Sequence, residues 1–305
     1  MQAHDTKGDM PGLAGRVRLR LWFAGLLCLV FAASAQARVE DRVELQLPSG
    51  QVATAQYRHG IKDVAVLVLH GFLQTSNYLT VSGLVAGLAD QGYTVLAPTL
   101  SLGVDRRRAS LDCAAIHIHN LSDDQDEIRR WVQWLESRGH RRIVLLGHSQ
   151  GSLELLAFVA DSPPPSVKLL IATSLVGTDF ILGEAVFKEQ IGRAERQRAA
   201  GGATLDAYRL SYCPRYMAPA DAFLSYANWP RSRILDTLAR LKVPARTILG
   251  GADPRMHPDW PAQLRQQGVD VAVITGAGHF FDAQYEFDLL DEVVSAIQSL
   301  PDGKP

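Results

Sequence analysis

A serine stands between two glycines in the segment Gly147-His148-Ser149-Gln150-Gly151. The apolar run before it, residues 142–146, is typical of a buried strand, and the apolar run after it is typical of a helix. A serine on such a strand-to-helix turn presents its hydroxyl at the end of a sheet, beside a helix N-terminus that favours developing negative charge. We therefore predict that Ser149 is a nucleophile and that Gly147 and Gly151 shape its elbow by allowing close approach of strand and helix.

A serine nucleophile needs a base, because the hydroxyl is a weak nucleophile at its own pKa. His279 follows the last expected strand, in Gly276-Ala-Gly278-His279-Phe280, where a loop histidine can reach back to Ser149. His148 belongs to the serine turn and is interpreted as a support for it. The other motif-free histidines are interpreted as structural or exposed, namely His59, His117, His119, His140 and His257. His117 and His119 alone are a weak metal signal, so no metal site is predicted.

The histidine needs an acid that fixes its tautomer and stabilises the imidazolium. Asp253 follows the penultimate expected strand, in Leu249-Gly-Gly-Ala-Asp253-Pro254, and is the first choice. Asp179, in Val176-Gly-Thr-Asp179, is the alternative, and Asp282 is too close to His279 in the sequence to be favoured.

Negative charge on the reacting oxygen must be met by two backbone N–H groups, an oxyanion hole. One is expected from Gln150, directly after the nucleophile. The other is expected from the loop His70-Gly71-Phe72-Leu73, with Phe72 as the best candidate and Leu73 next. Losing one such donor typically costs on the order of a hundredfold in rate.

The elements that must position these residues alternate between strand-like and helix-like patterns. Strands are expected over 43–47, 52–57, 64–69, 93–97, 142–146, 167–171, 245–249 and 269–274. Helices are expected over 79–90, 152–160 and roughly 281–300, with another beginning at a capping box of Ser122 and Gln125. The first two strands form a hairpin, and the later alternation predicts an α/β fold with a mostly parallel sheet covered by helices on both faces.

One stretch, residues 178–231, breaks this alternation. It contains no expected strand, but a helical run over 189–200 that leads into an aromatic-rich segment. We interpret it as a helical cap inserted into a core of residues 38–177 and 232–305. Residues that could line a substrate pocket with an apolar surface are Leu73, Tyr212, Tyr216, Met217 and Phe223. Burial of the cap against the core explains the aromatic residues equally well.

Four motifs together resemble the α/β-hydrolase superfamily: Leu69-His-Gly-Phe72, Gly147-His-Ser-Gln-Gly151, Gly251-Ala-Asp253 and Gly278-His279. The resemblance extends over about residues 43–300. It implies an eight-stranded, mostly parallel sheet, a Ser-Asp-His triad and no cofactor. Serine at 149 differs from the dehalogenases and epoxide hydrolases of the superfamily, which have aspartate at the elbow. The segment Pro98-Thr-Leu-Ser-Leu-Gly103 departs from the common form of its loop, which leaves the subfamily open.

The first 37 residues have the pattern of a secretory signal rather than of the fold. Three arginines (Arg16, Arg18 and Arg20) precede an apolar run that ends in Ala33-Ser-Ala35-Gln-Ala37. Small residues at such spacing favour cleavage after Ala35 or Ala37. We therefore expect a periplasmic or secreted protein, with retention of the segment as a membrane anchor as the alternative.

Two cysteines, Cys113 and Cys213, remain after this segment. In an oxidising compartment an even pair predicts one disulfide, with two buried thiols as the alternative. The net charge of −1 over 305 residues gives no electrostatic case for nucleic acid as a partner. The run Arg106-Arg107-Arg108 is interpreted as a solvated loop, with contact to an anionic substrate group as the alternative.

Together these residues predict an exported serine hydrolase that cleaves a small-molecule carboxylic ester, with an apolar group, through an acyl-enzyme on Ser149. A membrane is a partner only if the N-terminal segment is retained. Thioester, amide or peracid chemistry, or a lyase reaction, could use the same three groups. A non-catalytic binding protein of the same fold is the alternative from another class, but the complete set of Ser149, Asp253 and His279 argues against it.

Overall fold

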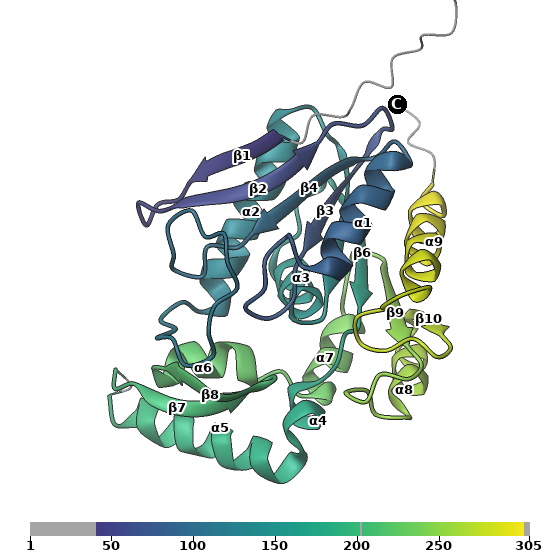
Figure 1. The fold of residues 1–305 in the computed structure, drawn as a ribbon. Helices are drawn as coiled ribbons and strands as arrows, with labels where there is room; N and C mark the ends of the chain where they lie inside the picture. The colour runs from purple at the N-terminus through teal and green to yellow at the C-terminus, as the bar shows by residue number, and fades with distance from the viewer. Residues whose placement is uncertain (1–40, 202, 302–305) are drawn as a thin grey trace, which may run out of the picture. The chain divides into compact units, whose positions relative to one another are not determined.

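The computed structural model describes residues 41–201 and 203–301, which build an α/β fold around one eight-stranded sheet (Figure 1). The strands lie in the order β1-β2-β4-β3-β5-β6-β9-β10. Strand β2 pairs antiparallel with β1 and β4, and all the other neighbouring pairs are parallel. The bounds are β1 Asp41–Gln46, β2 Val52–Arg58, β3 Val64–Leu69, β4 Thr94–Thr99, β5 Arg142–His148, β6 Val167–Thr173, β9 Ala245–Gly250 and β10 Asp270–Ile274. The expected α/β class and eight-stranded, mostly parallel sheet are confirmed.

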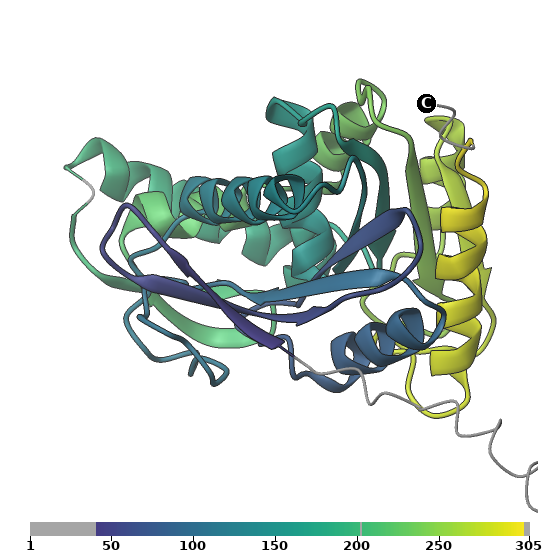
Figure 2. The ribbon, with the colours of Figure 1, turned by 90° about the horizontal axis from the view of Figure 1, so that it is seen from above.

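Helices cover both faces of this sheet (Figure 2), which explains why the central strand β3 is apolar at every position. In β3, Ala65, Leu67 and Leu69 belong to the core shared with α2 (Leu121–Ser137) and α3 (Gln150–Asp161). The alternate residues Val64, Val66 and Val68 belong to the core shared with α1 (Leu79–Asp90) and α9 (Tyr285–Gln298). One short strand therefore contributes to two hydrophobic cores, as its period of two requires.

The N-cap of helix α2 lies two residues before the expected one. Asn120, not Ser122, is the N-cap, and its side chain accepts hydrogen bonds from the N–H groups of Ser122 and Asp123. Asp123 completes the box by accepting from the N–H of Asn120 at 3.0 Å. The prediction of Ser122 and Gln125 was wrong because Asn and Asp fill these two roles as well as Ser and Gln do.

The segment between β6 and β9 is not purely helical. It contains α4 Thr178–Leu182, α5 Glu184–Ala199, β7 Asp206–Leu210, β8 Cys213–Ala218, α6 Ala220–Ala227 and α7 Arg231–Leu238. Strands β7 and β8 form an antiparallel two-stranded sheet of their own (Figure 1). The expectation of no strand here was wrong, because the turn at Ser211 lacks the glycine or asparagine that normally marks a hairpin. Ser211 itself adopts a φ of 53°.

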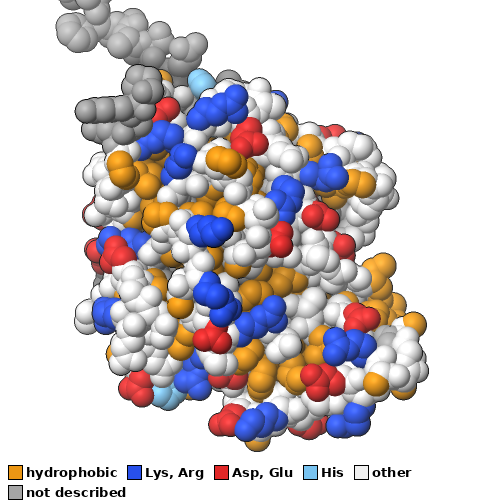
Figure 3. Space-filling model, turned by 180° about the vertical axis from the view of Figure 1, so that it is seen from behind, with side chains coloured by type: hydrophobic (Ala, Val, Ile, Leu, Met, Phe, Trp, Pro, Cys, Tyr) orange, Lys and Arg blue, Asp and Glu red, His pale blue; other side chains and the backbone are white. Residues whose placement is uncertain are grey.

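The remaining helix, α8 Trp260–Gln266, follows β9. Over residues 41–201 and 203–301, none of the helices combines the length and apolarity needed to cross a membrane. The expected signal segment, residues 1–37, lies outside the described residues. On the face drawn in Figure 3, Lys and Arg side chains are interspersed with Asp and Glu, and neither sign forms one continuous patch.

Candidate active site

Ser149 lies between β5 and α3 in a backbone conformation that L-residues rarely adopt, with φ 56° and ψ −118°. Strain of this kind costs about 1–3 kcal/mol and persists only where neighbouring groups enforce it. Here the N–H of Ser149 donates to Thr173 O at 2.8 Å, and its carbonyl accepts from the N–H of Ser152 at 3.0 Å. The end of the neighbouring strand β6 thus holds the serine turn in place.

The two flanking glycines are required by close backbone approach. A Cβ on Gly147 would lie 2.5 Å from the backbone nitrogen of Ser152. A Cβ on Gly151 would lie 2.4 Å from the carbonyl oxygen of His70, at the end of β3. Both distances are far below van der Waals contact, so any larger residue at either position would push α3 away from the sheet.

The structure joins Ser149, His279 and Asp253 in one hydrogen-bonded chain. His279 Nε2 lies 2.9 Å from Ser149 Oγ, and His279 Nδ1 lies 2.7 Å from Asp253 Oδ2. Because a carboxylate accepts, Nδ1 carries the ring proton and Nε2 is left free to accept the serine proton. His279 and Asp253 are 5% and 6% exposed, which protects this chain from competing water.

The loops after β9 and β10 bring Asp253 and His279 together. Asp253 Oδ1 accepts from the N–H of Arg255 at 2.8 Å, which orients the carboxylate. Ser174, directly after β6, donates its hydroxyl to the carbonyl of His279 at 2.7 Å and anchors the base from its other side. No motif marks Ser174 in the sequence, but its place directly after a parallel strand beside the elbow is a usable signal.

Two other candidates are engaged elsewhere. Asp179, the alternative acid, accepts hydrogen bonds from Nε of Arg231 at 3.0 Å and from the backbone N–H of Arg231 at 2.9 Å. It forms no hydrogen bond with His279. His148 Nδ1 donates to Thr173 Oγ1 at 3.1 Å, because that hydroxyl itself donates to the carbonyl of Gly147. Burial holds the pKa of His148 well below its ordinary value. His148 is therefore a neutral ring within the turn.

The predicted oxyanion donors lie at the ends of β3 and β5. Gln150 is the first residue of α3, so its N–H has no acceptor within the helix. Phe72 lies in a turn closed by the N–H of Gln74 donating to Gly71 O at 3.1 Å, with Leu73 at φ 57°. Among the described residues, the N–H of Phe72 donates to no backbone carbonyl. Both N–H groups are thus available to an oxygen atom of a ligand.

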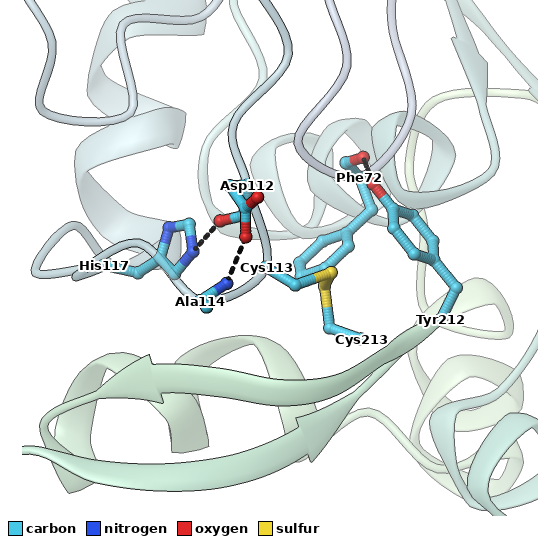
Figure 4. The surroundings of a disulfide bond; sticks show 7 residues. All are labelled: Phe72, Asp112, Cys113, Ala114, His117, Tyr212 and Cys213. Atoms are coloured by element: carbon cyan, nitrogen blue, oxygen red, sulfur yellow. Dashed lines mark hydrogen bonds between the residues drawn. A yellow bond between two sulfur atoms is a disulfide. The ribbon is translucent and has the colours of Figure 1, made fainter.

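The residues predicted to line a pocket separate into two groups. Tyr212 donates its hydroxyl to Phe72 O at 3.1 Å with its ring edge-on to that of Phe72 (Figure 4), and the Tyr216 ring lies 5.7 Å from the Phe72 ring. Leu73 is buried in the same loop. Phe223, in contrast, stacks at 4.1 Å on Tyr208 within the inserted segment, and the carbonyl of Met217 accepts from His117 N–H. Only the first group reaches the turn that carries Phe72.

A disulfide joins Cys113, in the loop between β4 and α2, to Cys213 at the start of β8 (Figure 4). The predicted disulfide is therefore present, and it lies beside Tyr212 and Phe72. His117 Nε2 donates to Asp112 O at 3.1 Å, and the ring stacks on Tyr216 at 4.3 Å. In the part of the chain that the structure describes, no group of three or more His, Cys, Asp or Glu residues is arranged to hold a metal ion.

Buried charged residues near this site were missed by the sequence analysis. Arg107 is 3% exposed, so the interpretation of residues 106–108 as a solvated loop is wrong for Arg107. The carboxyl groups of Asp124, Glu127 and Glu154 are buried as well, and burial raises the pKa of each. Asp124 shares the apolar face of α2, four residues before Ile128, which was a usable signal. Nothing in the sequence distinguished Arg107 from its exposed neighbours.

Comparison with known proteins agrees with this geometry. A family model described as the alpha/beta hydrolase family matches residues 66–290. Among solved structures, Est1E from Butyrivibrio proteoclasticus superposes with a TM-score of 0.60 at 15% identity, covering 85% of this chain and 99% of that one. A thioesterase domain from the curacin biosynthetic pathway superposes with a TM-score of 0.56 at 18% identity, covering 86% of this chain and 99% of that one. E-2-(acetamidomethylene)succinate hydrolase superposes with a TM-score of 0.55 at 16% identity, covering 86% of this chain and 100% of that one. At these identities the likeness concerns the fold, and no curated protein matches the chain by sequence.

Proposed function

Because the chain belongs to the alpha/beta hydrolase family, we propose that it is a serine hydrolase that cleaves a carboxylic ester through an acyl-enzyme on Ser149. The hydrogen-bonded chain from Ser149 through His279 to Asp253 carries this proposal. Each link has the length and the donor order that proton transfer from a serine hydroxyl requires. A non-catalytic binding protein of the same fold does not need a serine, a histidine and an aspartate joined by hydrogen bonds.

Acylation begins when Ser149 Oγ attacks the carbonyl carbon of the ester and its proton passes to His279 Nε2. Asp253 stabilises the imidazolium that forms, and the N–H groups of Phe72 and Gln150 receive the negative oxygen. Collapse of this intermediate breaks the ester C–O bond, and His279 returns the proton to the leaving alkoxide. An acyl ester on Ser149 and a free alcohol remain.

Water then removes the acyl group by the same steps in reverse order. His279 takes a proton from the attacking water, and the hydroxide adds to the acyl carbon. When the second intermediate collapses, the C–O bond to Ser149 breaks and His279 returns the proton to Oγ. The carboxylic acid leaves, and no redox partner or external cofactor enters the balance.

Turnover of matched substrates tests this proposal. Purified protein is assayed on p-nitrophenyl esters of increasing acyl length and on the corresponding thioesters. We expect ester hydrolysis that peaks at one chain length and is lost in Ser149→Ala, while Ser137→Ala, an exposed serine at the end of α2, keeps the activity. Faster cleavage of the thioester would replace the ester by the thioester in the proposal. Folded protein that cleaves neither would contradict it.

Export is a second part of the proposal. The disulfide between Cys113 and Cys213 supports it, because disulfides persist in oxidising compartments and are rare in the cytosol. Fractionation of the producing cells, followed by N-terminal sequencing, tests it. We expect mature protein outside the cytoplasm that begins after Ala35 or Ala37. Full-length protein in the cytoplasm with free thiols would contradict export.

A further inference from the structure

The guanidinium group of Arg107 is buried between two loops beside the candidate active site. Arg107 follows β4, and its side chain reaches from the 100–109 loop to the 70–74 loop. None of its hydrogen bonds goes to a carboxylate. A buried cation without a direct ion pair is uncommon, because its desolvation must be offset by hydrogen bonds to every donor.

Every donor of this group has an acceptor. A guanidinium carries five N–H groups. The five acceptors are Leu100 O at 2.6 Å from Nε, Ala109 O at 3.0 Å and Leu73 O at 3.4 Å from Nη1, and Gln74 O at 2.7 Å and His70 Nε2 at 3.1 Å from Nη2. No donor is left for a substrate, so contact with an anionic substrate group, the alternative interpretation of the arginine run, does not fit this side chain.

The contact between Arg107 and His70 is a donor–acceptor pair and not a repulsion. His70 Nε2 also accepts from the N–H of Leu100 at 3.1 Å, so this nitrogen carries no proton. The ring proton therefore lies on Nδ1 and is donated to Gly71 O at 2.9 Å. Burial, together with the charge of Arg107, lowers the pKa of His70 to about 3, which keeps the ring neutral.

The arginine itself stays charged at neutral pH. Burial lowers the pKa of Arg107 to about 10, which is still well above neutrality. The guanidinium is thus a permanent, planar donor set. Lysine offers three donors on one atom and cannot reproduce this fork.

The acceptors of Arg107 include two carbonyl groups of the turn that carries Phe72. Leu73 is in the left-handed region, which an L-residue occupies only when its surroundings hold it there. Its carbonyl accepts from Arg107 and from the N–H of Leu111, and the next carbonyl, Gln74 O, accepts from Arg107 as well. Arg107 thus holds two carbonyl groups of the turn directly. Through His70, whose Nδ1 donates to Gly71 O, it also acts on the peptide group that contains the Phe72 N–H.

We propose that Arg107 is the positioning residue of the oxyanion hole: it holds the 70–74 turn so that the N–H of Phe72 faces the reacting carbonyl oxygen. This inference rests on the proposed function. Arg107 does not touch the substrate, and it acts through Phe72. Because the N–H is needed most when the oxygen becomes negative, loosening the turn affects kcat more than KM.

Arg107→Lys and Arg107→Met test this role, with Arg106→Lys as the matched control. Arg106 is exposed in the same loop and pairs with Glu44 at 3.1 Å. Three quantities are measured with an ester that the wild type hydrolyses: kcat, KM, and the inhibition constant of an aryl boronic acid that forms a tetrahedral adduct on Ser149. Circular dichroism and thermal melting report folding, and titration with a fluorophosphonate counts active sites.

For both Arg107 variants we expect kcat per titrated site to fall at least tenfold, with KM changed less than threefold. The boronic acid should bind more weakly by a factor similar to the loss in kcat/KM, since it resembles the charged intermediate. Arg106→Lys should stay within twofold in all three quantities. A purely structural role would lower the number of active sites and leave kcat per site unchanged.

The outcomes separate this role from the proposed function. A wild type that neither hydrolyses esters nor reacts with the fluorophosphonate overturns the function, and this role with it. An active wild type with wild-type kcat per site in folded Arg107→Lys overturns this role alone. An Arg107→Lys protein that fails to fold also overturns it, because the arginine then holds the fold and not the turn.

Discussion

At the scale of single residues, the site depends on one proton path and on the neutral, buried groups around it. Ser149, His279 and Asp253 form a hydrogen-bonded chain. In it the serine hydroxyl can donate to His279 Nε2, and His279 Nδ1 donates to Asp253. Two buried histidines on the neighbouring turns, His148 and His70, are kept neutral by burial and add no competing charge. The base is thereby distinguished from its neighbours by its acid partner.

Replacement of the acid separates Asp253 from the alternative Asp179. Asp253→Asn should lower kcat by about 10⁴, because an amide favours the wrong tautomer of His279. Asp179→Asn should leave kcat within about twofold and lower the melting temperature, since it weakens only the pair with Arg231. Steady-state kinetics and thermal melting measure both. Equal losses of kcat in the two variants would contradict this assignment.

Glu154 should make stability fall as pH rises. Burial, followed by the charge of Asp124, raises its pKa in the folded state, whereas the unfolded chain has the ordinary value of about 4.5. Above that value the folded state holds a proton that the unfolded state has lost, so the free energy of unfolding decreases with increasing pH. Glu154→Gln removes the contribution of Glu154 to this slope.

Thermal melting from pH 4.5 to 8 measures the effect. The melting temperature of Glu154→Gln minus that of the wild type should increase steadily over this range. Glu195→Gln, at an exposed glutamate on α5, is the matched control. A constant difference for Glu154→Gln would show that its carboxyl group is not held protonated by the fold.

At the scale of elements, the strands and helices around the site were largely predictable because their patterns are strong. Strand β3 and helix α1 were predicted at their observed bounds, since an apolar run and a helical period are local signals. The β7–β8 hairpin was not predicted, because its turn uses Ser211 with a positive φ and β8 carries Pro214 at its second position. Pro214 is tolerated there because β8 has only one neighbouring strand.

The candidate triad was predictable for a related reason, and Arg107 was not. Each triad residue follows a recognisable strand and lies in a glycine-containing motif. The burial of Arg107 depends on acceptors from two loops that are far apart in sequence, among them Leu73 and Ala109. No local sequence pattern predicts a contact between such loops. Sequence therefore predicted groups attached to regular elements better than groups that tie loops together.

The contact between α3 and β3 depends on Gly151. Gly151→Ala places a Cβ 2.4 Å from His70 O, so it should shift the elbow, lower the melting temperature by several degrees and abolish turnover. Gly192→Ala is the matched control, because this glycine lies within α5 and its Cβ would meet only the end of the Arg196 side chain, at 3.4 Å. That change should stabilise the protein by about 0.5–1 kcal/mol. Similar melting temperatures for both variants would contradict the role of the elbow glycine.

At the scale of the whole molecule, the parallel sheet brings together residues that are far apart in the chain. Phe72, Ser149, Asp253 and His279 follow β3, β5, β9 and β10, so all four lie at the carboxyl edge of one sheet. This edge is where open α/β sheets bind their ligands. The inserted segment meets the same edge through Tyr212 and through the disulfide at Cys213.

The disulfide should contribute to the stability of this arrangement. Cys113 and Cys213 are separated by 100 residues, and closing a loop of that length stabilises a fold by about 2–5 kcal/mol. Cys113→Ala combined with Cys213→Ala should lower the free energy of unfolding by that amount in a urea titration. A reductant should lower the wild type to the level of the double variant and leave the double variant unchanged. Equal stability with and without reductant would contradict this contribution.

The central claim is that Ser149 is a nucleophile activated by His279. Reaction of the folded protein with a fluorophosphonate, followed by peptide mass spectrometry, tests it most directly. The account predicts one adduct per chain, located on Ser149, and at least a hundredfold slower labelling in His279→Ala. An adduct on another residue, or no adduct on folded wild-type protein, would contradict the claim.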